Sequence, residues 1–462
     1  MTRPPLRGDE LPRMVVPPPG PRSRAAARRL RRSEGSAIWG REQSPIVWSR
    51  ARGAVVEDLD GNRYLDFTSG FGAASLGHAA PEVRRAITRQ AGRLIQGLGD
   101  LQPHVARERL IRRLAPLGGR LDSVLLASTG SEAVELALKT VAITTGRRRV
   151  VAFTGGYHGD SYGALEVTHH PQAPGPLQGQ LKRLAVHVPY PYPYRCPLEA
   201  RCEADRCDLR CLEEALATID RELEGGDPPG AILVEPIQGR AGGIVPPPEF
   251  LSRLCAAARG RGLLVIYDEV LTGAGRTGPF WAWERSGPEA EPDLLVAGKG
   301  LGGGAAIAAL FGRRVLMEAW RAHVPPSGEA PHASTFYAHP LACAGALAAI
   351  ERLTEPGFRA RVDALGGALS GGLKRIESRH PAVGEARSVG LLGAIELVRD
   401  RSGRAPAPEA LGPLLAALLR RGILVVPGGR HENAISILPP LTISEAQLAH
   451  GLEAIDAALG EI

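Results

Sequence analysis

One lysine lies where an amine could do chemistry. The chain has only four lysines: Lys139, Lys182, Lys299 and Lys374. Lys299 follows the apolar run "LLVAG" and precedes the Gly-rich "GLGGG". An amine in such a place is partly desolvated, which lowers its pKa and favours the free base that a Schiff base requires. A phosphate-binding P-loop is not indicated, because a Walker A motif has its glycines before the lysine.

Two adjacent acids, Asp268 and Glu269, end a second apolar run, "LLVIYDEV". On a strand they point to opposite faces. An acid at the carboxyl end of a parallel strand lies where α/β folds bind ligands, and if it is buried it needs a cationic partner. A pyridinium nitrogen would serve, and so would a structural salt bridge. The residues alone leave both interpretations open.

A third motif, "LLASTGSEAVELALK", predicts a strand that turns into a helix through small residues. The turn consists of Ser128, Thr129, Gly130 and Ser131, and Glu132 follows in the first helical turn. Backbone N–H groups at a helix N-terminus favour an anion such as phosphate. The alternative is an ordinary capped helix, since Ser and Thr are good N-caps.

Strands and helices alternate around these motifs. We predict strands over 123–128, 149–155, 230–236, 263–270 and 292–298, with helices over 131–145 and 249–262. Short apolar runs separated by helices indicate an α/β chain with a largely parallel sheet covered on both sides. A helix over 342–353 leads to an α+β region whose clearest strands are 388–398 and 422–429. Asp60-Gly61 predicts a hairpin near the start.

The composition is that of an ordinary globular protein. The chain has 462 residues, 44% of them hydrophobic, and no apolar run approaches the roughly 20 residues that span a bilayer. The N-terminus lacks the apolar core of a signal peptide, so we expect a cytoplasmic protein with no membrane partner. Many arginines behind the net charge of +7 lie in the first 35 residues. No nucleic-acid-binding motif accompanies them, and we expect no nucleic-acid partner.

Together the three motifs resemble one family, the class III (ω-) aminotransferases of pyridoxal-phosphate (PLP) fold type I. The resemblance covers roughly residues 45–450, and four further segments match in order: "FTGGYHGDSYGA", "AILVEPIQGRAGG", "HASTFYAHPLACA" and "ILVVPGG…ISILPPLTIS". It implies pyridoxal 5'-phosphate as cofactor and a mostly parallel central sheet flanked by helices. We therefore expect a basic arm over 1–35 and a large PLP-binding domain over 101–345. A smaller α+β domain is expected from 36–100 and 346–462.

The resemblance also implies a role for each matching residue. Lys299 forms the Schiff base with PLP and moves the substrate proton, and Asp268 pairs with the pyridine nitrogen. Tyr157 stacks on the ring and Glu235 lies near its edge, which completes the catalytic set.

The remaining cofactor contacts come from the same resemblance. Ser128, Thr129, Gly130 and Ser131 form the phosphate turn. His158 lies beside Tyr157, and Val270 packs on the other face of the ring. Thr335 reaches the phosphate of a neighbouring subunit, which implies a homodimer.

Four positions depart from the family pattern. Leu271 stands where a glutamine commonly reaches the cofactor, and Asp160 where an arginine follows "YHG" in γ-aminobutyrate-type enzymes. Ser436 replaces an arginine that binds a substrate carboxylate, and Arg240 replaces a gating glutamate. One hypothesis is that Arg240 receives the substrate carboxylate, since bidentate binding suits a guanidinium. The alternative is that Arg240 pairs with Glu235 or another acid.

Four of the six cysteines cluster: Cys196, Cys202, Cys207 and Cys211. They contain no C-x-x-C pair, so the usual zinc spacing is missing and we predict no metal site. A disulfide or metal role for this cluster stays open. The segment resembles a Cys-bearing insertion of some diaminobutyrate-type enzymes, and its tyrosines Tyr190, Tyr192 and Tyr194 could shape the substrate entrance.

The resemblance implies a ping-pong aminotransferase that takes nitrogen from an ω-amino or diamino acid and gives it to a 2-oxo acid. The alternative keeps the fold and cofactor but makes the chain an amino-acid racemase, epimerase or aminomutase. A third possibility is a binding or regulatory module acting through the basic arm. The presence of Lys299, Asp268 and the phosphate motif argues against it.

The first prediction concerns Lys299. Lys299→Ala removes the amine that would hold the cofactor covalently, so the visible absorbance of the Schiff base should be lost completely. The measurement is an absorbance spectrum of the purified variant after incubation with PLP. A variant that kept the absorbance would show that another residue carries the cofactor.

Overall fold

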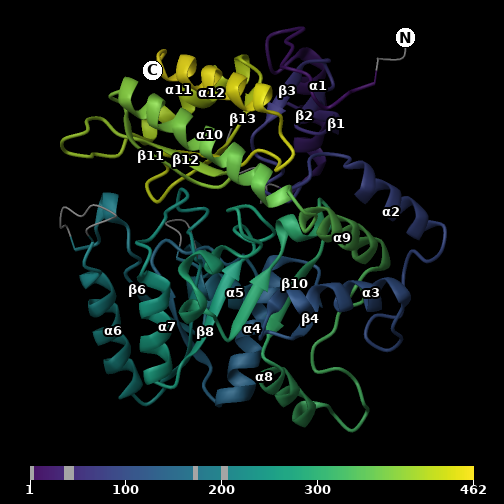
Figure 1. The fold of residues 1–462 in the computed structure, drawn as a ribbon, viewed down its shortest axis with the longest axis vertical. Helices are drawn as coiled ribbons and strands as arrows, with labels where there is room; N and C mark the ends of the chain where they lie inside the picture. Colours follow the sequence, from purple (N-terminus) through teal and green to yellow (C-terminus); the bar gives the residue numbers. More distant parts are fainter. Residues whose placement is uncertain (1–4, 36–45, 170–174, 199–206) are drawn as a thin grey trace.

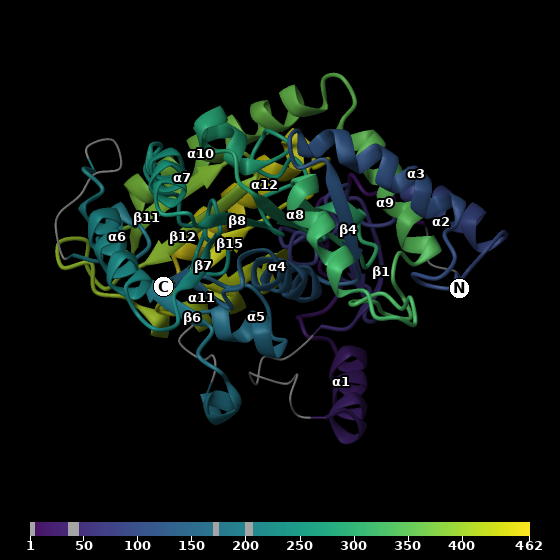
Figure 2. The ribbon, with the colours of Figure 1, turned by 90° about the horizontal axis from the view of Figure 1, so that it is seen from below.

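The computed structural model describes residues 5–35, 46–169, 175–198 and 207–462. A large domain and a small domain lie one above the other, and helix α9 (Pro340–Leu353) runs between them (Figure 1). Helices α2 (Pro81–Ala91) and α3 (Val105–Leu114) pack against α9 on one side of the molecule (Figure 2). No helix among the described residues is long and apolar enough to cross a membrane.

The large domain is built on a seven-stranded sheet in the order β4-β10-β9-β8-β7-β5-β6. Its strands are β4 (Ser123–Ala127), β5 (Arg149–Phe153), β6 (Ala185–Val188), β7 (Pro229–Val234), β8 (Leu264–Glu269), β9 (Leu294–Ala297) and β10 (Ala308–Gly312). Only β10 runs antiparallel to its neighbours. The predicted mostly parallel sheet is confirmed, and the strands β4 and β9 are joined through β10, for which the sequence analysis predicted no strand.

Helices cover both faces of this sheet because its strands alternate two sets of apolar side chains. Val151 and Phe153 of β5 face α6 (Arg210–Leu223) and α7 (Phe250–Gly260). Val150 and Ala152 face α4 (Gly130–Thr145), α5 (Tyr162–Val167) and α8 (Arg314–Glu318). The double cover leaves the strand ends as the accessible part of the sheet.

The small domain joins both ends of the chain. Strands β1 (Trp48–Arg52), β2 (Val55–Asp58) and β3 (Arg63–Asp66) form a sheet with β13 (Ile423–Leu424). The second sheet has the order β11-β12-β15-β14, from β11 (Val383–Val389), β12 (Leu392–Leu397), β15 (Ala434–Ile437) and β14 (Val426–Gly428). Helices α10 (Phe358–Arg379), α11 (Pro408–Arg420) and α12 (Glu445–Leu459) pack on these strands. The hairpin predicted at Asp60-Gly61 joins β2 to β3.

Two predicted strands of this domain were wrong as single elements. Residues 388–398 contain the end of β11, a turn at Gly390 with φ +55°, and all of β12. A Cβ on Gly390 would lie 2.6 Å from the backbone of Thr277, so the turn is tight and glycine-dependent. Residues 422–429 hold β13 and β14, which belong to different sheets.

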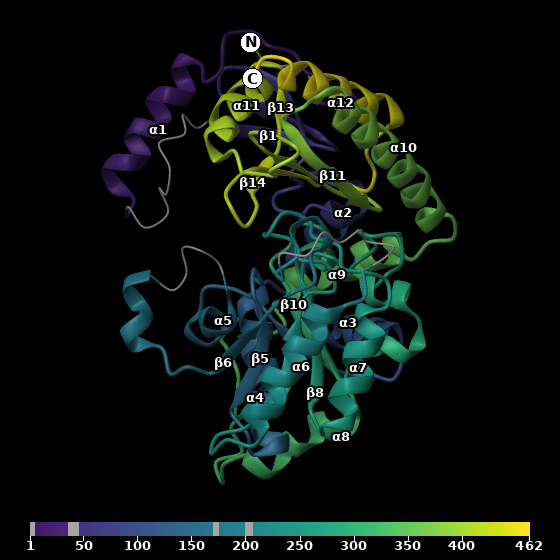
Figure 3. The same cartoon turned by 90° about the vertical axis from the view of Figure 1, so that its left-hand side faces the viewer.

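The N-terminal arm is tied to the small domain. Backbone N–H groups of Val15 and Val16 donate to Asn62, and Gln447 of α12 donates to the carbonyls of Gly8 and Glu10. The arm then forms α1 (Pro21–Ser33), which extends beside the small domain (Figure 3). Asp60 accepts hydrogen bonds from its first turn and so caps it from a distant part of the sequence.

A buried charge network joins the two domains. Arg387 of β11 donates to the carbonyl of Gly242 in the large domain at 2.7 Å and to the hydroxyl of Tyr192 at 2.8 Å. Glu396 of β12 accepts from Arg387 and from Arg195. Burial alone would raise the pKa of Glu396, but these two guanidinium groups outweigh it and keep the pKa below its ordinary value. The network therefore fixes the small domain on the large one.

The same network corrects one expectation. Tyr190 and Tyr192 do not shape an entrance, because both are buried. Tyr190 donates to the carbonyls of Glu235 and Pro236, and Tyr192 lies under the guanidinium of Arg387 at 5.1 Å.

Glu269, at the end of β8, secures the chain beyond the strand. Its buried carboxylate accepts hydrogen bonds from the N–H groups of Ala282 and Trp283 at 2.8 and 2.9 Å, and from the hydroxyl of Thr272. Burial raises its pKa to about 7 against these donors. The adjacent Asp268 points to the other face, as predicted for a strand.

The second prediction follows from Glu269. The folded state holds this proton to a higher pH than the unfolded chain does. Its contribution to stability is therefore complete below about pH 4.5 and is lost as the pH rises through about 7. Between about pH 5 and 7, the free energy of unfolding of Glu269→Gln should gain on that of the unsubstituted chain by about 1.4 kcal/mol per pH unit. Urea denaturation at several pH values measures this, with exposed Glu289→Gln as control. A pH-independent difference would contradict it.

Candidate active site

The ionisable groups singled out in the sequence meet at the carboxyl edge of the large sheet. Strands β5, β7, β8 and β9 are neighbours and run in parallel, so their ends lie side by side. Tyr157, Glu235, Asp268 and Lys299 each lie at or just after one of these ends. Parallel α/β sheets bind ligands at this edge.

Lys299 begins the short 3-10 helix η7 (Lys299–Gly302) with φ +34°, a conformation that costs energy for a side-chain-bearing residue. Such strain persists where surrounding structure enforces it and is concentrated at functional sites. Burial lowers the pKa of Lys299, and the charges of Asp268 and Glu235 only partly oppose this. The structure thus favours a free amine at this position.

Asp268 is buried and held in one orientation. Its Oδ2 lies 2.7 Å from Nδ1 of His158, and its Oδ1 accepts from the N–H of Val270 at 3.0 Å. His158 is itself held in place because its backbone N–H donates to the hydroxyl oxygen of Thr168. The sequence analysis expected His158 beside Tyr157. The structure shows in addition that its ring contacts and orients the Asp268 carboxylate.

Glu235 bridges two loops with its two carboxylate oxygens. Oε1 accepts from the N–H of Tyr157 at 3.0 Å and Oε2 from the N–H of Gly239 at 2.8 Å. Burial raises its pKa. Because both oxygens are taken by backbone groups, Glu235 positions Tyr157 and the residue after Gly239, which is Arg240.

Arg240 is exposed, and its guanidinium lies 4.7 Å from the centroid of the Tyr157 ring. Within the part of the chain that the structure describes, no carboxylate forms an ion pair with Arg240. The Tyr157 hydroxyl donates to Asp160 at 2.8 Å, and burial together with this bond raises the pKa of Tyr157 to about 12. A pairing of Arg240 with Glu235 is not seen in the described residues, where both Glu235 oxygens accept from backbone N–H groups.

The turn that the sequence analysis assigned to phosphate joins β4 to α4 as a capped strand-to-helix turn. Helix α4 begins at Gly130, and the Thr129 side chain caps it by accepting from the N–H of Glu132. Ser131 Oγ accepts from the N–H of Asp160 at 3.3 Å. The N–H of Ser128 donates to Glu132 at 2.8 Å, which pulls the turn onto the helix.

Small residues leave a cradle between this turn and Lys299. A Cβ on Gly130 would lie 3.0 Å from Val270, and one on Gly72 would lie 2.9 Å from Leu271 and 3.9 Å from Cδ of Lys299. Side chains at these positions would fill the space beside the amine. The loop carrying Gly72 was missed in the sequence, although its small residues after the buried run "YLDF" were a usable signal.

Leu271 and Ser436 mark the apolar side of the site. Leu271 packs with a cluster that includes Ile237 and Leu392, and it lies so close to Gly239 that a Cβ there would be 2.2 Å away. Ser436 is buried in β15, paired with Val426 of β14. Beyond β14, the N–H of Gly429 donates to the carbonyl of Arg240 at 3.1 Å. The strands near Ser436 thus reach the backbone of Arg240.

Three expectations from the sequence concern residues outside this site. Thr335 is exposed, and its carbonyl accepts from Gln96 at 2.6 Å. Cys196, Cys207 and Cys211 are free thiols, whereas Cys202 lies outside the described residues. Among described residues, no group of three or more His, Cys, Asp or Glu side chains could hold a metal ion.

The residues present fit PLP. A desolvated amine suits its aldehyde, an oriented carboxylate its ring nitrogen, and a helix N-terminus with a serine its phosphate. The absence of a side chain at Gly72 leaves space beside Cδ of Lys299. This donor set occurs together at one sheet edge.

Comparisons with known proteins agree with the geometry. Residues 38–459 match the family described as Aminotransferase class-III. The 5-aminovalerate aminotransferase of Pseudomonas aeruginosa is 33% identical over 90% of this chain and 94% of its own. The alanine/serine racemase of Pyrococcus horikoshii is 32% identical over 97% and 93%.

Among solved structures, an amine transaminase from an uncultivated Pseudomonas species in its PLP-bound form superposes with a TM-score of 0.83. That structure has 29% sequence identity and covers 93% of this chain and 98% of its own. The fold type I architecture and PLP as cofactor follow from this agreement. The chain belongs to the class III PLP-dependent aminotransferases.

Proposed function

We propose that the chain transfers the amino group of an ω-amino or diamino acid to a 2-oxo acid by a ping-pong mechanism. The observation that carries the proposal is the site itself, with Lys299, Asp268 and the α4 N-terminus arranged around one cradle. The chain is also similar to enzymes named for 4-aminobutyrate and 5-aminovalerate. Both names denote amino acids whose amine is remote from the carboxylate.

Each residue has a defined task in this reaction. When bound, PLP would supply an aldehyde and an electron-withdrawing ring that make the C–H of the amine-bearing substrate carbon acidic. Lys299, whose pKa is lowered by burial, would take the proton from that carbon and return it to the carbon of the former aldehyde. Asp268 would face the ring nitrogen, and His158 keeps that carboxylate aimed. Ser131 and the N–H groups at the start of α4 hold the phosphate.

Arg240 supports the substrate class. It is a cation without an acidic partner among the described residues, and it stacks on Tyr157 at the edge of the site. Glu235 fixes both members of this pair through backbone N–H groups. We assign to Arg240 the distal carboxylate of the donor, since Ser436 offers no charge there.

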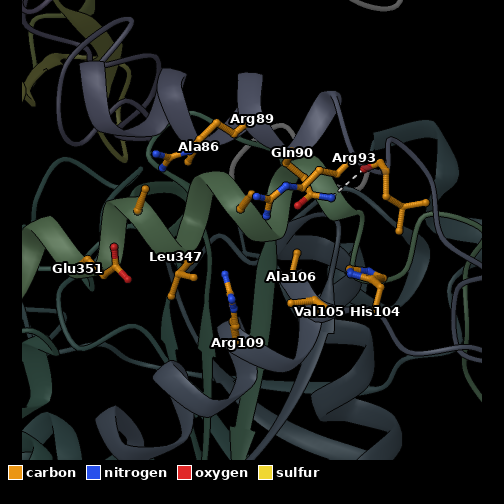
Figure 4. Close-up of a pocket in the computed structure, with 13 residues that line it drawn as sticks. Ala86, Arg89, Gln90, Arg93, His104, Val105, Ala106, Arg109, Leu347 and Glu351 are labelled. Atoms are coloured by element: carbon orange, nitrogen blue, oxygen red, sulfur yellow. Dashed lines mark hydrogen bonds between the residues drawn. The ribbon is translucent and has the colours of Figure 1, made fainter.

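A homodimer with a shared phosphate site is part of the proposal. Large apolar side chains are exposed at Phe71, at Phe336 and along the stretch from Leu94 to Val105. In the proposed dimer, a second copy of the chain covers this surface. Leu94 and Val105 also line a cavity of about 490 Å³ between α2, α3 and α9, together with Arg89, Arg93 and Arg109 (Figure 4). Thr335 lies exposed beside this surface, bonded to Gln96.

We also propose a cytoplasmic location. The five cysteines of the described residues are all free thiols, and three of them are buried. A reducing compartment keeps thiols in this form. Fractionation of cells with an antibody to the chain tests this assignment.

Racemisation is the second candidate function. The similarity to an alanine/serine racemase extends over 97% of the chain, and both reactions remove a proton from the carbon that bears the amine. The two differ in whether the nitrogen stays on the substrate. An acceptor-free reaction therefore separates them.

The third prediction is such a reaction. With an ω-amino acid and no oxo acid, the purified enzyme should lose its visible absorbance in proportion to donor and release at most one equivalent of oxo product per site. Adding a 2-oxo acid should restore the spectrum. Single-enantiomer alanine or serine that racemises without any oxo acid would instead establish the second candidate.

The fourth prediction concerns Arg240. Arg240→Ala should raise the KM for ω-amino acids by roughly 10- to 100-fold, because one charge-assisted contact is lost. The KM for a primary amine without a carboxylate should change little, and Arg240→Lys should recover part of the loss. Steady-state kinetics with matched donors measures this, and an unchanged KM for carboxylate donors would end the assignment.

A further inference from the structure

Glu132 connects two structural elements that the proposed function treats separately. Its Oε2 accepts from the N–H of Ser128, which opens the phosphate turn of its own chain. Its Oε1 lies 3.6 Å from Nε2 of His332, just beyond hydrogen-bond distance, and that buried nitrogen has no hydrogen-bond partner among the described residues. His332 belongs to the loop that carries Thr335. His332 is the main cause of the lowered pKa of Glu132. One carboxylate thus contacts both phosphate-binding segments.

The direction of these contacts is fixed by Lys139. Its Nζ lies 2.9 Å from Nδ1 of His332, and an ammonium group has donors but no acceptor. Nδ1 of His332 must therefore accept, which leaves the proton of the neutral ring on Nε2, facing Glu132. The sequence of contacts runs from Lys139 through His332 and Glu132 to the backbone of Ser128.

The loop beyond His332 is anchored again at its far end. Nε2 of His104 lies 2.8 Å from the carbonyl of Ala338. Nδ1 of the same ring accepts from the N–H of Arg107, so Nε2 carries the proton and donates. Thr335 lies between the His332 and His104 anchors and is exposed. Its place on the surface therefore depends on both histidines.

We propose that His332 is a positioning residue for the partner's phosphate site, and that Glu132 ties it to the phosphate turn of its own chain. The inference rests on the proposed homodimer in which Thr335 reaches the partner's phosphate. Ordering of one phosphate turn by PLP holds Glu132, His332 and hence Thr335 in place. Each cofactor site is then strengthened by occupancy of the other.

The fifth prediction is tested by PLP affinity. Cofactor-free enzyme is titrated with PLP, and binding is followed by visible absorbance. His332→Ala should weaken binding about 10-fold, the scale of an ordinary coupling between sites. His332→Gln should keep most of the affinity, because its amide can donate toward Glu132 and accept from Lys139. Exposed His323→Ala is the matched control and should bind as the unsubstituted enzyme does.

Mixed dimers test whether the effect crosses between subunits. One protomer carries Lys299→Ala, so only its partner gives the visible signal. His332→Ala placed on the Lys299→Ala protomer should weaken binding at the partner's intact site. The inference would be overturned if PLP binding weakened only when His332→Ala lies in the protomer that retains Lys299. It would also be overturned if His332→Gln and His332→Ala lost PLP affinity equally.

The proposed function has a separate failure. A chain that binds no PLP, or that remains monomeric by light scattering after gel filtration, would remove the shared site altogether. A dimer that binds PLP normally but shows no effect of His332→Ala in the mixed dimer would overturn only the role of His332.

Discussion

The dominant constraint on this molecule is the removal of several ionisable groups from water in one small volume. Lys299, Asp268 and Glu235 are all held at the carboxyl edge of the large sheet, and burial lowers the pKa of Lys299 and raises that of Glu235. The surrounding structure offsets this with directed hydrogen bonds from His158 and from backbone N–H groups. The double cover of helices on the sheet makes such an environment possible, because it leaves the strand ends as the accessible part of the sheet.

Directed hydrogen bonds also hold buried charges at the contact between the two domains. Glu396 and Arg387 are buried together, and their bonds reach the carbonyl of Gly242, close in sequence to Arg240. A buried ion pair adds little net stability but is costly to break, so it defines one arrangement strongly. The domain contact and the loop that carries Arg240 are therefore held by one network. Glu235 completes it from the large domain by holding the N–H of Gly239.

The sequence predicted the strand ends and their acids well, because apolar runs and turn residues are local signals. Local residue patterns were enough to predict the parallel sheet, the hairpin at Asp60-Gly61 and the turn before α4. Predictions failed where tertiary contacts decide: the tight turn at Gly390 divides one apolar run into two strands, and Tyr192 is buried by a domain that is remote in sequence. The spacing of residues in the sequence could not decide whether Arg240 pairs with Glu235. The answer depends on the folded loops, whose backbone N–H groups occupy both Glu235 oxygens.

The scarcity of lysine has a practical consequence for labelling. Lys139, Lys182 and Lys374 are exposed on the described surface, whereas Lys299 is half-buried, is held with positive φ and has a pKa lowered by burial. The molecule thus carries three hydrated amines and one desolvated amine. Reagents that attack free amines in water and reagents that must first enter the site will separate these two populations. A peptide map of modified chain then becomes a direct reporter of whether the site is open or filled.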